Sequence, residues 1–185
     1  CIDNCVYDSN VGQADGDEDG TGDACDNDEC DDATVIGSLP YSNTQDASFA
    51  TSDESDPADD CACEVDGSSV WYSYTAAADG LVSIDTIGSD YDTVLSVWGG
   101  TCGDYPPNLA CNDDPFDLQS FVQFWACAGE TYLIEVEAYC DDGADTLVLN
   151  VSSTPQDTDG DGVGDGVVER AADPLPPPPG TPRPA

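Results

Sequence analysis

Short hydrophobic runs separated by turn-forming residues fill the middle of the chain. Six of these runs are rich in β-branched and aromatic residues, and clusters of Gly, Asp, Asn and Pro lie between them. This pattern is typical of β-strands joined by turns. No stretch shows a helical period, so the expected fold class is all-β with about eight strands. We expect strands at 69–75, 81–87, 93–99, 120–126, 131–139 and 146–152, with two less regular strands near 34–36 and 47–50.

Alternation with a period of two separates the two faces of the last two expected strands. In 131–139 the apolar side chains are expected on one face, and Glu135 and Glu137 on the other. In 146–152 the apolar side chains are expected to point inward, which leaves Asn150 outside. Strands of this number and spacing predict a β-sandwich of about 120 residues.

Composition divides the chain into four regions. Residues 1–29 and 155–169 are acidic and Gly-rich, and they flank the expected sandwich at 30–154. Residues 170–185 contain seven prolines and are expected to form a semi-rigid polyproline II tail.

The charge of the chain excludes several classes of partner. The formal net charge is −38, with no His, no Lys and only two Arg. No basic surface can meet the phosphates of a nucleic acid or of an anionic membrane. No apolar run approaches the roughly 20 residues that a membrane-spanning helix needs. We therefore expect no nucleic-acid partner and no membrane insertion.

The composition also argues against catalysis. Without His or Lys the chain has no Ser–His pair, no Cys–His pair and no Schiff-base lysine. Paired carboxylates can cleave glycosides, but here they fall in loops and turns. The sequence predicts a protein that is not an enzyme.

Ten cysteines indicate disulfides formed in an oxidising, extracellular compartment. Without His, zinc sites built from Cys and His are excluded. Cys102 and Cys111 bracket a hairpin loop, and Cys127 and Cys140 flank the strand at 131–139, so each couple is expected to pair. Cys30 is expected to pair with Cys61 or Cys63. The chain has no signal peptide and no Met, so we expect a processed chain or a piece of a longer one.

The acidic segment 15–26 has the ligand spacing of a calcium loop. Gly20 lies at position 6, where a sharp turn is needed, and Thr21 at position 7 would offer its carbonyl oxygen. Carboxylates occupy positions 1, 3, 5, 9 and 12: Asp15, Asp17, Asp19, Asp23 and Asp26. An EF-hand is not expected, because no helices flank the loop and position 12 is Asp. The alternative is an acidic, disordered linker.

A second acidic loop repeats this core over residues 157–165. Its position 12 is Val168 and Glu169 comes one residue late, so we expect weaker calcium binding or a ligand donated by water or a neighbouring chain. A flexible linker is again the alternative. The expected ligands are Asp157, Asp159, Asp161, the carbonyl oxygen of Val163 and Asp165.

The stretch "DNCVYDSNVGQADGDEDGTGDACD" (3–26) resembles a thrombospondin type 3 repeat. The resemblance implies a non-helical calcium loop closed by a Cys5–Cys25 disulfide. Val6 departs from the family, which usually has proline there. Cys1 would then need another partner, or would mark a lipidated bacterial protein.

The sandwich region resembles bacterial pre-peptidase C-terminal domains. The stretches "SVWYSYTAAADGLVSIDTIGSDYDTVLSVWGG", "ACNDD" and "AGETYLIEVEAY" carry the resemblance. It implies a non-catalytic jelly-roll module of secreted or surface proteins, some of which bind calcium or polymeric substrates. Asp92, Asp113 and Asp114 are candidate metal ligands at one sheet edge, although a role as turn-formers is favoured.

Two functions fit these features. The favoured one is a calcium-stabilised extracellular structural module, a subunit of a surface fibre or filament on a bacterium, whose partners are copies of itself or neighbouring surface proteins. The alternative is an accessory module of a secreted hydrolase that binds polysaccharide or protein through exposed aromatics. On strands such aromatics are more often core residues. The aromatics available are Trp71, Tyr72, Tyr74, Trp98 and Trp125.

Two positions are candidate glycosylation sites. Asn150-Val151-Ser152 is an N-linked sequon, and Thr181 lies among prolines as an O-linked candidate.

Overall fold

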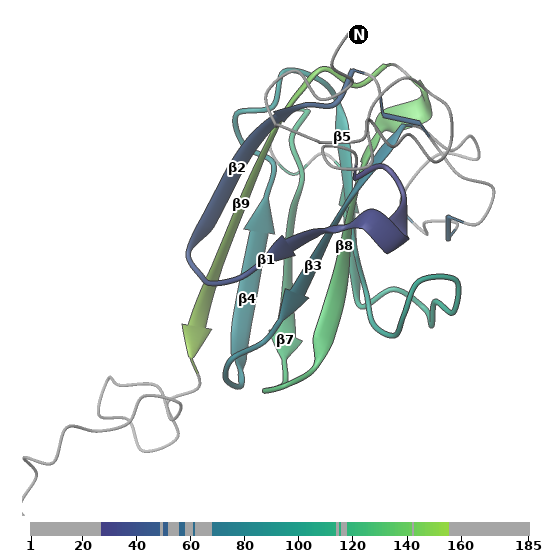
Figure 1. The fold of residues 1–185 in the computed structure, drawn as a ribbon. Coiled ribbons are helices and arrows are strands. Elements are labelled where there is room, and N and C mark those ends of the chain that lie inside the picture. Colours follow the sequence, from purple (N-terminus) through teal and green to yellow (C-terminus); the bar gives the residue numbers. More distant parts are fainter. Residues whose placement is uncertain are drawn as a thin grey trace, which may run out of the picture.

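The computed structural model describes residues 27–48, 50–51, 56–57, 61, 68–113, 115, 118–141 and 143–155. Strands dominate this part of the chain, with two short 3-10 helices (Figure 1). No helix among the described residues is long and apolar enough to cross a membrane. The elements are η1 (Cys30–Asp32), β1 (Thr34–Ile36), β2 (Tyr41–Asp46), β3 (Ser69–Thr75), β4 (Gly80–Asp85), β5 (Thr93–Trp98), β6 (Ala110–Asp113), β7 (Phe121–Ala126), β8 (Thr131–Ala138), η2 (Tyr139–Asp141) and β9 (Thr146–Pro155).

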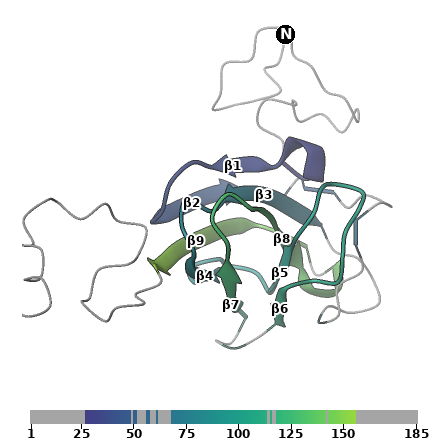
Figure 2. The ribbon, with the colours of Figure 1, turned by 90° about the horizontal axis from the view of Figure 1, so that it is seen from below.

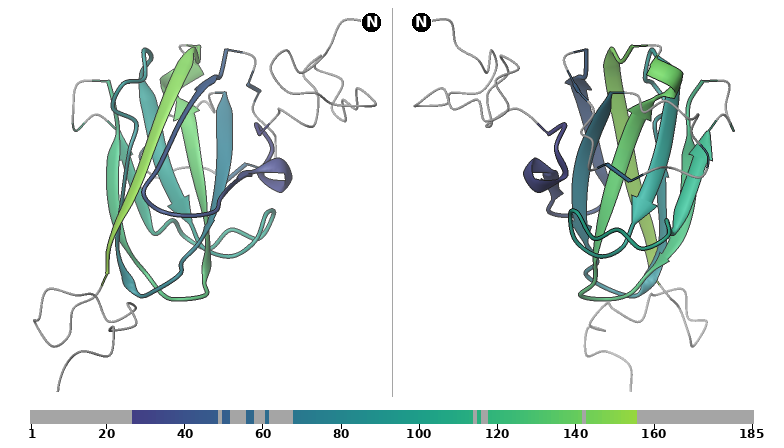
Figure 3. Two further views of the ribbon diagram at one scale, coloured as in Figure 1. Left: turned by 60° about the vertical axis from the view of Figure 1, so that its left-hand side comes forward. Right: turned by 90° about the vertical axis from the view of Figure 1, so that its right-hand side faces the viewer.

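The strands form two sheets that pack face to face (Figures 2 and 3). One has five strands in the order β1-β3-β8-β5-β6, and the other has four in the order β2-β9-β4-β7. Neighbours are antiparallel except β1 and β3, which are parallel. The predicted all-β sandwich is confirmed.

The core lies between the sheets and follows the alternation of the sequence. Strand β4 buries every second side chain, and β9 does the same over its first half. Opposing residues interdigitate, as Phe124 of β7 and Tyr132 of β8 do with ring centroids 4.8 Å apart. Burial of this apolar area is the main driving force for folding.

The six predicted hydrophobic strands correspond to β3, β4, β5, β7, β8 and β9, and the weaker strand at 34–36 is β1. The strand expected near 47–50 is wrong, because the strand in this region is β2 at Tyr41–Asp46. Its inward positions include Asn43 and Gln45, so no apolar alternation marks it. These amides bond to the hydroxyl of Tyr72, at 3.1 Å from Asn43 Nδ2 and 2.8 Å to Gln45 Oε1. The short β6 was not predicted for the same reason, since its sequence ACND is mostly polar.

Glu135 and Glu137 lie on the face opposite the core, as expected, but that face is covered. Their exposed fractions are 0% and 3%. A second hydrophobic cluster, containing Trp71 and Trp98, packs on this outer side of the five-stranded sheet. The indole Nε1 of Trp98 donates to Glu135 Oε2 at 2.8 Å, which compensates part of the cost of burying a carboxylate.

Three expected disulfide pairings are wrong. Cys30 bonds to Cys102, with Cα atoms 5.6 Å apart, so it pairs with neither Cys61 nor Cys63. Cys61 bonds to Cys111, with Cα atoms 6.0 Å apart, which excludes the Cys102–Cys111 pair.

The third wrong pairing is Cys127–Cys140. Cys127 is a free, exposed thiol, whereas Cys140 is disulfide-bonded. The wrong pairings were predicted from proximity along the chain, whereas the observed disulfides join cysteines 72 and 50 residues apart. Cys5 and Cys25 lie outside the described residues.

Candidate functional site

One of the five candidate aromatics is available to a ligand. Trp71, Tyr72, Tyr74 and Trp98 are buried, whereas Trp125 exposes 52% of its surface. The contrast fits the general tendency of strand aromatics to serve as core. Trp125 is therefore the residue around which a binding site can be built.

The alternation of β7 places Trp125 on the outer face of the four-stranded sheet. Successive side chains of a strand point to opposite faces. Val122, Phe124 and Ala126 are buried in the core, so Gln123 and Trp125 face outward and are exposed.

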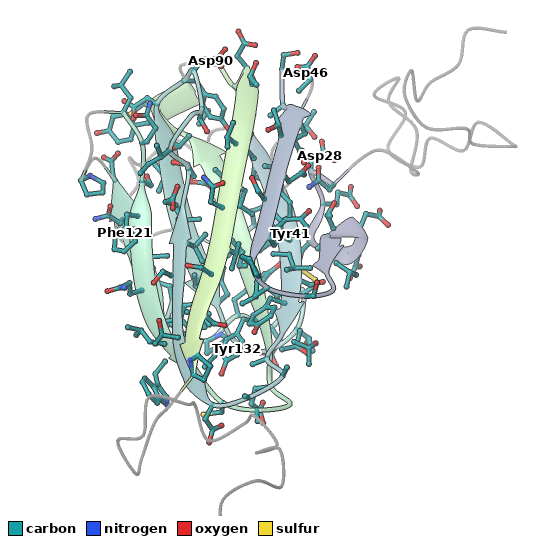
Figure 4. The ribbon with its side chains drawn as sticks, turned by 90° about the vertical axis from the view of Figure 1, so that its left-hand side faces the viewer. Asp28, Tyr41, Asp46, Asp90, Phe121 and Tyr132 are labelled. Atoms are coloured by element: carbon teal, nitrogen blue, oxygen red, sulfur yellow. A yellow bond between two sulfur atoms is a disulfide. The ribbon has the colours of Figure 1, made fainter. Side chains whose placement is uncertain are left out.

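We call this outer surface the Trp125 face; Figure 4 looks onto this side of the molecule, with Phe121 of β7 labelled. The strand register arranges its side chains in three rows across the sheet. The rows are Trp125, Leu81 and Thr154; then Gln123, Ser83 and Ser152; then Phe121, Asp85, Asn150 and Ser42.

Hydrogen bonds hold the polar side chains of these rows in place. Gln123 Nε2 donates to Ser83 Oγ at 2.9 Å. In the third row, Ser42 Oγ donates to Asn150 Oδ1 at 2.9 Å, and Asn150 Nδ2 donates to Asp85 Oδ1 at 2.9 Å. The face therefore offers small, oriented hydroxyl and amide groups beside one large exposed ring.

The carboxyl groups of the Trp125 face decide whether this face could cleave a glycoside by acid–base chemistry. Asp85 is the one carboxylate in its three rows. Acid–base cleavage of a glycoside needs two carboxyl groups on either side of the bond. These rows do not supply such a pair.

The predicted metal ligands are mostly outside the described residues. This holds for the loops 15–26 and 157–165 and for Asp114. Asp92 immediately precedes β5, and Asp113 pairs with Val94 in the register, so both lie at one end of neighbouring strands. In the described part of the chain, no three His, Cys, Asp or Glu side chains form a group that could hold a metal ion. A metal site formed by Asp92, Asp113 and Asp114 stays a prediction.

The two candidate glycosylation sites differ in what the structure describes. Asn150 is half-buried in the middle of β9, and both ends of its amide are hydrogen-bonded. Thr181 lies outside the described residues. N-linked modification of Asn150 would have to replace these hydrogen bonds.

A small acidic pocket of about 140 Å³ lies beside the Cys30–Cys102 disulfide. Sequence analysis did not find it, because its acidic walls come from separate segments. Burial raises the pKa of Tyr105 in this pocket, and the nearby carboxylates of Asp56, Glu135 and Asp31 raise it further. The lining residues are Glu29, Cys30, Asp31, Asp56, Cys102, Gly103 and Tyr105.

Comparison with known proteins gives distant similarities in structure. No family model and no curated protein matches the chain. The pre-peptidase C-terminal domain of a collagenase from Bacillus anthracis is similar with 16% identity and a TM-score of 0.45, covering 65% of this chain and 94% of that one. PliG, a periplasmic inhibitor of g-type lysozyme from Aeromonas hydrophila, has 18% identity and a TM-score of 0.40, covering 66% of this chain and 96% of its own.

A family 35 carbohydrate binding module from an environmental isolate has 17% identity and a TM-score of 0.29, covering 48% of this chain and 67% of that one. Similarities at this level do not identify a ligand for this chain. A proposed function therefore has to rest on the residues of the Trp125 face.

Proposed function

We propose that this protein is a non-catalytic binding module that attaches to a neutral polysaccharide through the Trp125 face. The observation that carries the proposal is the 52% exposure of Trp125 on an outward strand position. Leaving half of an indole in water forgoes part of its hydrophobic stabilisation. A ligand that covers the ring recovers that free energy.

The surroundings of Trp125 favour a sugar over a protein as the ligand. A protein interface typically has a continuous apolar core surrounded by a polar rim. Here the other exposed side chains of the three rows, Gln123, Ser152, Thr154 and Ser42, are polar. Sugar rings present an apolar C–H face that can stack on an indole and hydroxyl groups that can bond to such amides and hydroxyls.

The charge of the chain favours a neutral polysaccharide. A net charge of −38 repels polyanions over distances comparable to the Debye length. A polysaccharide with uronate or sulfate groups would also meet the Asp85 carboxylate.

The observed disulfides are consistent with this role, because structural disulfides persist in oxidising compartments outside the cytosol. The filament function stays a prediction. The two predicted calcium loops and the proline-rich tail, on which that prediction depends, lie outside the described residues.

Retention of the chain on neutral polysaccharides tests the proposal. Affinity electrophoresis through gels containing soluble mannan, xylan, starch or cellulose derivatives should retard the unmodified chain on at least one of them. Trp125→Ala should weaken that binding by about 5- to 150-fold, if a sugar ring stacked on the indole contributes the ~1–3 kcal/mol that a nucleobase contributes when it stacks on an aromatic side chain. Leu109→Ala is the matched control, because Leu109 is 50% exposed on another part of the surface. Retention of Trp125→Ala equal to that of the unmodified chain would contradict the proposal.

A further inference from the structure

The third row of the Trp125 face contains an oriented carboxylate. The register places Asp85 of β4 beside Asn150 of β9, and Asn150 beside Ser42 of β2. Asp85 Oδ1 accepts hydrogen bonds from Asn150 Nδ2 at 2.9 Å and from the backbone N–H of Ile87 at 3.1 Å. Two donors on the same oxygen fix the orientation of the carboxylate.

The same bonds fix the amide of Asn150. Its Nδ2 also donates to the carbonyl oxygen of Ile87 at 3.3 Å, and its Oδ1 accepts from Ser42 Oγ at 2.9 Å. The amide therefore cannot turn without losing partners on both sides. Asn150 acts as a positioning residue that holds Asp85 from the side of β9.

The second oxygen of Asp85 is left for a ligand. A carboxylate can accept about four hydrogen bonds, two on each oxygen. No described residue donates a hydrogen bond to Asp85 Oδ2, and the side chain is half-buried on the sheet face. A half-buried acceptor of this kind binds a hydroxyl donor more strongly than a mobile, fully solvated one does.

We propose that Asp85 determines the specificity of the Trp125 face by accepting a hydrogen bond from one hydroxyl group of the bound polysaccharide. This inference rests on the proposed function and names the part of the ligand that the same face recognises. The proton donor is the sugar hydroxyl and the acceptor is Asp85 Oδ2, while Oδ1 keeps its bonds to Asn150 and Ile87.

The spacing along the strands sets the size of the ligand. Trp125 pairs with Leu81 and Phe121 pairs with Asp85, so the ring and the carboxylate are four residues apart along the strand direction. At a rise of ~3.3 Å per residue this is roughly 13 Å. A single sugar cannot span that distance, so the stacked sugar and the recognised hydroxyl belong to different units of one oligosaccharide.

Calorimetric titration with neutral oligosaccharides of increasing length tests this assignment. The ligands are fragments of the polysaccharide that retains the chain. Asp85→Asn keeps the Oδ1 acceptor and the shape of the side chain but replaces Oδ2 with an NH2 group, which donates hydrogen bonds and cannot accept one. We expect Asp85→Asn to bind long oligosaccharides about tenfold more weakly, because a charged acceptor is lost. Short fragments that reach only Trp125 should bind the variant and the unmodified chain equally.

Asp46→Asn is the matched control. Asp46 is exposed on the outer side of β2, next to Thr146 in the register and outside the three rows. The Asp46→Asn variant should bind every fragment with the same affinity as the unmodified chain does. Equal affinity of Asp85→Asn and the unmodified chain for long fragments would overturn the inference.

A measurement on the unmodified chain guards against a folding defect in the variant. Among monodeoxy versions of the long fragment, removal of one hydroxyl away from the stacked sugar should cost about tenfold in affinity. If every such deoxy fragment binds as well as the parent, the assignment of Asp85 fails while the polysaccharide function stands. If no neutral fragment binds at all, the proposed function itself fails.

Discussion

Tyr72 shows at the scale of one residue how this sandwich tolerates polar groups in its core. Its side chain is completely buried, and its hydroxyl donates to Gln45 Oε1 and accepts from Asn43 Nδ2. The hydroxyl therefore explains why β2 can present two amides to the core. Burial raises the pKa of Tyr72 well above its usual value, and it does the same for Tyr91.

These raised pKa values predict a loss of stability in alkaline solution. Below pH ~10 both tyrosines are neutral in the folded and unfolded states. Above it they ionise in the unfolded state first, so the unfolded state binds fewer protons and the free energy of unfolding falls as the pH rises. Urea unfolding between pH 8 and 11.5, in a Cys127→Ser background that removes the free thiol found among the described residues, should show this decline. Tyr72→Phe should make the decline shallower, and an unchanged decline in that variant would show that Tyr72 is not its source.

The residue scale also shows where sequence reasoning fails for the site. On β3, Trp71 lies two residues from Ser69 and two from Ser73, and on β7, Trp125 lies two residues after Gln123. Each tryptophan therefore shares a strand face with polar residues. Polar neighbours on the same strand face suggest that both tryptophans are exposed to solvent. Trp71 is nevertheless buried, because Tyr105 stacks on it with ring centroids 5.8 Å apart. That cover comes from a distant loop, which no local pattern reveals.

At the scale of the elements, alternation predicted the strands whose inward positions are apolar. Strand β8 is the clearest case, because its position follows directly from the sequence pattern. Strand β2 shows the limit, since Asn43 and Gln45 face inward and only their bonds to Tyr72 make this possible. From the sequence, the candidate binding residues could be narrowed to a few aromatics. The three rows of side chains on the Trp125 face could not be predicted, because they depend on the register between strands.

The disulfides are also features of elements rather than of local sequence. The Cys61–Cys111 bond joins β6 to a position 50 residues earlier. Closing a loop of that length stabilises the folded state by about 4 kcal/mol on the chain-entropy estimate. The double variant Cys61→Ser with Cys111→Ser should lose up to that amount in urea unfolding, whereas Cys127→Ser should change little. Peptide mapping that found Cys102 joined to Cys111 would contradict the pairing.

At the scale of the whole molecule, the strongly acidic composition is the dominant feature. A net charge of −38 opposes folding unless cations bind or accumulate. The loop at 15–26, whose sequence resembles a thrombospondin type 3 repeat, has the oxygen ligands that calcium prefers. We propose calcium as the bound cation there.

Calcium binding by this loop can be tested with a matched pair of variants. Asp19→Ala removes an expected ligand at position 5, and Glu18→Ala removes the neighbouring carboxylate that is not expected to bind the ion. Calorimetry should show calcium binding that Asp19→Ala greatly weakens and Glu18→Ala preserves. Equal effects of the two variants would indicate general screening by calcium rather than a site.

For the molecule as a whole, we propose that a neutral polysaccharide covers Trp125. The chain has three tryptophans, and two of them, Trp71 and Trp98, are buried. Acrylamide quenching of tryptophan fluorescence therefore reports mainly on Trp125. With the polysaccharide that retains the chain, we predict that the quenchable fraction falls as the ligand saturates the protein and that Trp125→Phe abolishes this change. If saturating polysaccharide leaves the quenching of the unmodified chain unaltered, the ligand does not cover Trp125 and the proposed binding face is wrong.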